Sequence, residues 1–79
     1  MVTITVVNGS LKRYGIRAWN THTYLGVKVD VAVDRDVTDD FVLNIYVGFD
    51  VSKVGYDKVS EIYNYVNNNK DMILKGFGY

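Results

Sequence analysis

The sequence predicts an α+β fold, in which an antiparallel β-meander of four or five strands is covered on one face by one C-terminal helix. Apolar and polar residues alternate along residues 24–33 and 41–49, which is the period of a half-buried strand. After residue 49 the period changes to that of an amphipathic helix. Because 79 residues leave room for one core, residues 1–79 are expected to form a single domain.

The first predicted hairpin lies in residues 2–18. β-Branched residues alternate along residues 2–7 and end at Asn8-Gly9, a dipeptide that favours a tight turn because both residues tolerate positive φ. Residues on the two faces alternate again along residues 14–18, which predicts a second strand. Its alternation is displaced by one residue from the register that a two-residue turn at Asn8-Gly9 would give. We therefore expect a β-bulge near residues 12–13. Residues 20–23 are expected to form a loop or turn.

The clearest predicted hairpin joins residues 24–33 to residues 41–49. Every second residue of each segment is apolar, so the two apolar faces coincide when the strands pair. These faces are predicted to bury Leu25, Val27, Val29, Val31, Val33, Phe41, Leu43, Ile45, Val47 and Phe49. Residues 34–40 are polar and are expected to connect the two strands.

The helix is predicted from apolar residues at spacings of three and four, which form one face that can pack on the sheet. These residues are Val59, Ile62, Tyr63 and Val66. Either Ser52 or Asp57 could cap the start of the helix. Asn residues at 67–69 are expected to end it, and the apolar residues of 70–79 are expected to fold back as an extra turn or a short edge strand.

Charge is segregated along the chain although the net charge is zero. Residues 1–29 contain four bases and no acid, whereas residues 30–61 contain eight acids and three bases. In a meander the first and third connections lie at the same end of the sheet. Lys12 and Arg13 are therefore expected to lie near an acidic loop that contains Asp34, Asp36, Asp39 and Asp40, which would leave Arg17, His22 and Lys28 as a small basic patch.

The composition favours a cytoplasmic protein with no membrane partner. The chain has no Cys, and its start lacks the basic residues and long apolar stretch of a secretory signal. The abundance of Tyr and Asn and the absence of Pro in so short a chain are typical of small proteins that phages and mobile elements encode.

The residues predict neither catalysis, nor a metal site, nor a cofactor. His22 is the only His, and no nucleophile or carboxylate stands at motif spacing from it. Zinc needs three or four nitrogen or sulfur ligands. The acidic loop offers oxygen ligands, but it lacks the Gly and the terminal Glu of an EF-hand and is interpreted as a solvated hairpin end.

The candidate binding surface is the sheet face that points away from the helix. Alternation places there a set of aromatic and basic residues: Arg17, Trp19, Tyr24, Lys28 and Tyr46. Gly15, Gly26 and Gly48 lie among them, and strand glycines often mark a bulge or the close approach of another backbone or a ligand. The alternative interpretation is an ordinary solvated face.

We therefore expect a small non-catalytic protein-interaction module, such as an inhibitor or adaptor. It would bind a larger protein through the outer sheet face, an edge strand or the acidic loop. The first strand lacks Lys and Pro on its outer face, so homodimerisation through that edge is also an option. The alternative function is single-stranded nucleic-acid binding, with bases stacked on Trp19, Tyr24 and Tyr46 beside Arg17 and Lys28.

Overall fold

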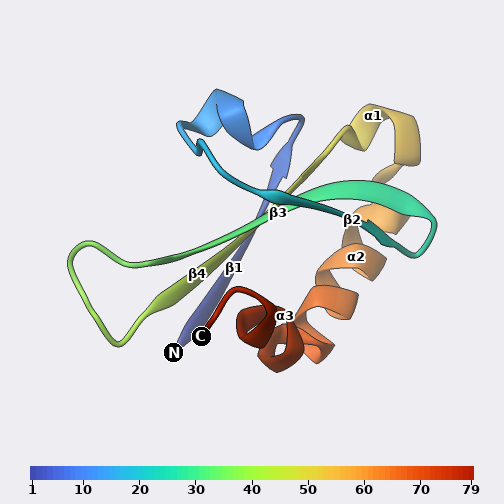
Figure 1. Cartoon of the computed structure of the whole chain (residues 1–79). Helices are drawn as coiled ribbons and strands as arrows, with labels where there is room; N and C mark the ends of the chain where they lie inside the picture. Colours follow the sequence, from blue (N-terminus) through green and yellow to red (C-terminus); the bar gives the residue numbers. More distant parts are fainter.

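The computed structural model describes residues 1–79 and confirms an α+β fold. A four-stranded sheet has the order β1-β4-β3-β2, and helices follow the last strand (Figure 1). The strands are β1 (Val2–Asn8), β2 (Asn20–Tyr24), β3 (Val27–Arg35) and β4 (Leu43–Phe49). A 3₁₀ helix, η1 (Leu11–Tyr14), follows β1, and the helices after β4 are α1 (Val51–Val54), α2 (Tyr56–Asn68) and α3 (Lys70–Gly76).

The predicted meander is wrong because β1 pairs with β4 and runs parallel to it. Instead of turning back at Asn8-Gly9, the chain leaves the sheet there. Gly9 has a φ of 97°, and its N–H donates to the carbonyl of Phe49 at 2.7 Å, which extends the β1–β4 pairing by one bond. The Ser10 hydroxyl then caps η1 by accepting from the N–H of Lys12 at 3.2 Å. Neither the strand predicted over residues 14–18 nor the bulge near residues 12–13 forms.

Part of the outer sheet face is covered by η1 and the residues after it. Leu11 is fully buried there against Val7 and Ala32, and Ile16, Trp19 and Tyr46 pack around them in a small second core. Gly48 in β4 permits this packing. A Cβ at Gly48 would lie 2.7 Å from the carbonyl oxygen of Gly9 and 3.0 Å from Leu11, so only Gly fits.

Residues 20–24 form β2, not the expected loop or turn, and pair antiparallel with β3. The turn between these strands is Leu25-Gly26, with φ values of 51° and 79°. Positive φ at both central residues is the geometry of a type I′ hairpin turn. Leu25 is therefore a partly exposed turn residue rather than a core residue, and Tyr24, opposite Val27, is buried.

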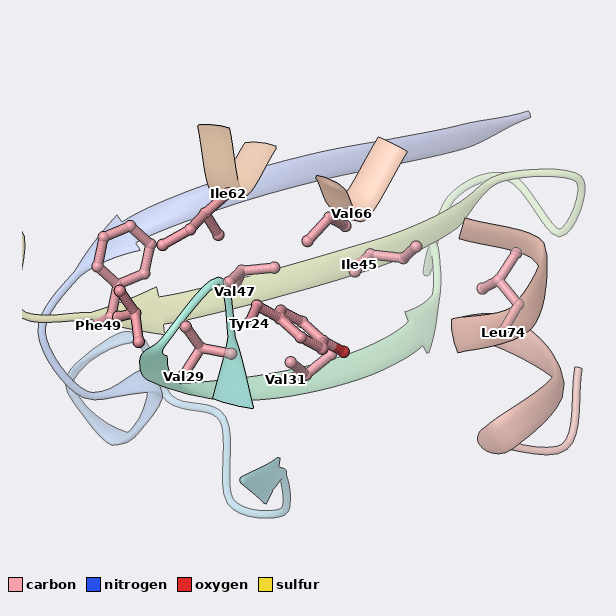
Figure 2. Close-up of a cluster of buried hydrophobic side chains, with 10 residues drawn as sticks. Tyr24, Val29, Val31, Ile45, Val47, Phe49, Ile62, Val66 and Leu74 are labelled. Atoms are coloured by element: carbon pink, nitrogen blue, oxygen red, sulfur yellow. The ribbon is translucent and has the colours of Figure 1, made fainter. Parts of the chain in front are cut away.

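The main core lies between the sheet and the C-terminal helices (Figure 2). The predicted alternation is confirmed for residues 27–33 and 43–49, and Ile62 and Val66 are fully buried as expected. Each fully buried aliphatic side chain contributes about 1.5–3 kcal/mol to the free energy of unfolding. Tyr63 and Phe41 are 43% and 86% exposed, so their predicted burial is wrong.

Three helices take the place of the single helix that was predicted. The Asp50 carboxylate caps α1 by accepting from the N–H and hydroxyl of Ser52 at 3.1 and 2.6 Å, and Gly55, with a φ of 85°, separates α1 from α2. Asn69 ends α2 and donates its side-chain amide to the carbonyl of Tyr65 at 2.8 Å. Residues 70–76 then form α3, so the alternative of an edge strand is wrong.

Candidate functional site

The sheet divides the five predicted binding residues between its two sides. Trp19 and Tyr46 lie on the outer side, where both pack against the second core. Lys28 faces the same side because it alternates with the buried Val27 and Val29, and Arg17 lies in the connection between η1 and β2. Tyr24 lies on the opposite, helix-facing side and belongs to the main core, so its predicted place on the outer face is wrong.

The three glycines do not flatten an open face. Gly15 and Gly26 lie in turns, with φ values of 82° and 79°. Gly48 does mark the close approach of another backbone, and that backbone is the connection after β1 in the same chain. The outer face therefore offers less free surface than the sequence predicts.

The carboxylates of the acidic loop shape the β3–β4 connection. Asp36 accepts from the N–H and hydroxyl of Thr38 at 2.8 and 2.7 Å, and these hydrogen bonds hold the pKa of its carboxyl below the usual range. Asp39 accepts from the N–H of Phe41 at 3.0 Å, and Asp34 accepts from the amide of Asn44 at 3.2 Å. Asp40 lies in the same loop and accepts from Arg35 through its backbone carbonyl at 3.1 Å.

The acidic loop and η1 lie at opposite ends of the β1–β4 pair. Val2 pairs with Leu43, just after the loop, whereas Asn8 pairs with Phe49 at the end where η1 follows (Figure 1). The expected neutralisation of Lys12 and Arg13 by the acidic loop is therefore wrong. Charge segregation in the sequence persists in space.

A groove separates the inner side of β2 from the C-terminal helices. It has a volume of about 220 Å³. Because α2 packs closest to β1, at the far edge of the sheet, the inner side of β2 is left partly open. The groove is lined from β2 by Asn20, His22 and Tyr24, and from the helical side by Tyr65, Asn69, Met72, Ile73, Gly76 and Phe77.

Three aromatic rings form one wall of this groove. The rings of His22 and Tyr24 stack with centroids 5.6 Å apart and planes within 6°. Tyr24 also meets Tyr65 of α2 at 4.9 Å with the planes tilted by 39°. Burial, and secondarily the neighbouring Tyr65, raise the pKa of the Tyr24 phenol. Such packed rings hold their positions at little entropic cost when a ligand binds.

This groove was not predicted from the sequence, because residues 20–23 were expected to form a loop or turn and form β2 instead. One weak signal was available: Thr21 and Thr23 are β-branched residues two positions apart, and Gly26 stands directly before the alternation of residues 27–33. Tyr65 also stands three residues after Ile62 and so shares the side of α2 that packs on the sheet.

A second hollow, with a volume of about 520 Å³, lies beside η1 and is here called the basic hollow. It is lined by Lys12, Gly15, Ile16, Arg17 and Trp19. Trp19 is half-buried there, and its apolar surface forms one wall. The hollow combines two cations with one aromatic ring.

No similarity to a known protein indicates what either surface binds. No group of three or more His, Asp or Glu side chains is arranged to hold a metal ion. None of the helices is long and apolar enough to cross a membrane. Comparison of the chain with protein-family models, with curated proteins and with solved structures found no match.

Proposed function

We propose that this protein is a non-catalytic interaction module that binds a segment of a larger protein in the groove beside β2. The observation that carries the proposal is the combination of an aromatic wall with an open strand edge in one concave site. Clustered Tyr side chains in a concave site are typical anchors of protein interfaces. As an inhibitor, the module would cover part of its partner's surface. As an adaptor, it would connect its partner to another protein.

The size of the groove favours a side chain of a partner over a small-molecule substrate. Ligand pockets have volumes of about 300–1,000 Å³, and this groove has about 220 Å³. The one imidazole in it, His22, stacks on Tyr24 rather than pairing with a carboxylate that could orient it for proton transfer. Both properties support binding of an apolar side chain.

The charges around the groove favour an acidic partner. Arg17 precedes β2, Lys28 faces outward beside it, and Lys70 and Lys75 lie on α3, against two acids, Asp30 of β3 and Asp71 of α3. The only ion pair of the structure joins Lys58 to Glu61, so no carboxylate of the chain engages these bases. Complementary charge accelerates association and selects among partners.

The test is a selection of random linear peptides displayed on phage against the immobilised wild-type chain. The enriched peptide is then synthesised and its Kd is measured for two variants. Met72 lines the groove and is 70% exposed, so Met72→Asp places a charge at the site without disturbing the core. Val37, 98% exposed in the acidic loop, provides the matched control Val37→Asp.

We expect Met72→Asp to weaken binding at least about tenfold, which corresponds to about 1.4 kcal/mol. Val37→Asp should leave the Kd unchanged. A selection that enriches no peptide, or an enriched peptide that binds Met72→Asp as tightly as wild type, rejects the proposal.

A second candidate function, single-stranded nucleic-acid binding, is supported by the basic hollow. Lys12, Arg13 and Arg17 lie away from the acidic loop, and Trp19 offers a ring for stacking a base. This function predicts quenching of Trp19 fluorescence by oligonucleotides at low salt, with an affinity that falls steeply as salt is added. Absence of quenching at micromolar protein rejects it.

A further inference from the structure

We propose that the bound segment adds to the sheet as a fifth strand, hydrogen-bonded to the open edge of β2 at Thr21 and Thr23. This inference rests on the proposed function and deepens it, because it assigns the backbone conformation and the side-chain pattern of the partner. Strand addition to an exposed sheet edge is a general mode of peptide recognition.

Backbone pairing shows which residues of β2 face the open edge. In β3 the backbone groups of the even-numbered residues bond to β4. Asp36, directly after β3, shows this because its N–H donates to the carbonyl of Val42 at 2.9 Å, and hydrogen-bonded pairs recur at every second residue. The odd-numbered residues of β3 therefore bond to β2, and their partners there are Asn20, His22 and Tyr24.

The backbone groups of Thr21 and Thr23 point the other way, toward the open edge. The hairpin turn confirms this assignment, because the residues that flank a two-residue turn, Tyr24 and Val27, form a hydrogen-bonded pair. No backbone hydrogen bond outside the sheet reaches either Thr. Two N–H and two C=O groups are thus available to an added strand.

Strand addition determines where the side chains of the partner point. Residues paired with Thr21 and Thr23 lie on the outer face, and the residue between them, opposite His22, points toward the helices. That direction leads into the groove lined by His22, Tyr24 and Tyr65. The central residue of the partner is therefore apolar, and one large side chain fills the cavity.

Charge distinguishes the two outer-face positions of the partner. Thr23 pairs with Lys28, whose ammonium has no carboxylate partner, so the residue opposite Thr23 is acidic. Thr21 pairs with Asp30 and donates its hydroxyl to that carboxylate at 3.4 Å, so an acid opposite Thr21 is disfavoured. The recognised segment is an extended chain with one apolar residue and a carboxylate on one side of it.

The decisive variant is Thr23→Pro, measured with the enriched peptide of the selection described above. Proline is tolerated on an edge strand where its missing N–H would face solvent, but it cannot donate to an added strand. Thr23→Ala is the matched control because it removes the same side chain and keeps the N–H. We expect Thr23→Pro to weaken binding about tenfold and Thr23→Ala to leave the Kd within about twofold.

Two further measurements keep the inference testable if Thr23→Pro does not fold. Hydrogen exchange on the wild-type chain should show amide protection at Thr21 and Thr23 only when the peptide is bound. Lys28→Glu should weaken binding of a peptide with one Glu beside its apolar residue and strengthen binding of its Lys counterpart.

The outcomes separate strand addition from the proposed function itself. If Met72→Asp weakens binding but Thr23→Pro equals Thr23→Ala and the two amides stay unprotected, the groove is the site and strand addition is wrong. If no peptide is enriched, the proposed function fails first. A wild-type dimer that Thr23→Pro dissociates, without peptide binding, would show that a second copy occupies this edge and would overturn the inference.

Discussion

Substitution of Gly48 by Ala tests whether η1 is held against the outer sheet face by close backbone contact. The new Cβ would lie 2.7 Å from the carbonyl oxygen of Gly9, which is too close for a non-bonded contact, and backbone cannot move aside as a flexible side chain can. Overpacking of this kind costs about 1–3 kcal/mol. If η1 instead lifts away, the fully buried Leu11 loses its burial, at a cost of about 1.5–3 kcal/mol.

Both routes give a loss of about 2 kcal/mol, which lowers the Tm of a domain of this size by roughly 8–16 °C. Urea denaturation followed by circular dichroism measures the loss. Fluorescence of Trp19, the only Trp, reports separately on η1 because Trp19 packs against the same second core. Gly76→Ala is the control: no atom lies within 4 Å of its added Cβ, and its stability should be equal or slightly higher. A Gly48→Ala variant within about 0.5 kcal/mol of wild type would refute the close-contact explanation.

Three further predictions concern stability. Leu25→Asn should raise the free energy of unfolding by about 1 kcal/mol in thermal denaturation, because Leu25 holds a φ of 51° that Asn tolerates better; an unchanged or lower Tm contradicts this. Leu11→Ala should lower it by about 2–3 kcal/mol in urea, and a loss under about 1 kcal/mol would mean that the second core contributes little. Hydrogen bonds lower the pKa of Asp36 and Asp50, so their contribution is complete above the ordinary pKa of about 3.9 and is lost as the pH falls through the lowered values. A variant in which Asn replaces both Asp36 and Asp50 should therefore lose less stability than wild type on acidification. An equal loss of stability in the two proteins would contradict the assignment.

Strands and helices with one buried face could be predicted from the sequence, because their apolar residues recur with the period of the element. Residues 27–33 and 43–49 alternate because each strand has one buried face, and Ile62 and Val66 are buried for the corresponding reason in a helix. The parallel pairing of β1 with β4 could not be predicted in this way. Asn8-Gly9 tolerates positive φ equally well in a hairpin turn and where a chain leaves the sheet, and the partner strand begins far along the sequence.

Tyr24 was assigned to the wrong face of the sheet because one turn was not recognised. Counting alternation through Leu25 as a core residue placed Tyr24 on the outer face. In the structure Leu25-Gly26 is the turn itself, and restarting the alternation after it puts Tyr24 on the helix-facing side. The groove also needs Tyr65 and α3, which come from the far end of the chain, and no local pattern indicates which strand they will meet.

Parallel pairing between β1 and β4 also constrains the order in which the molecule can fold during synthesis. Each residue of β1 finds its partner 41 positions later, from Val2 with Leu43 to Asn8 with Phe49. The hairpins β2–β3 and β3–β4 close over short connections, whereas β1 must wait as an unpaired β-branched segment until the ribosome has released β4. The strand that is made first of the four is therefore the last to enter the sheet, and the nascent chain carries an exposed aggregation-prone segment until β4 has emerged.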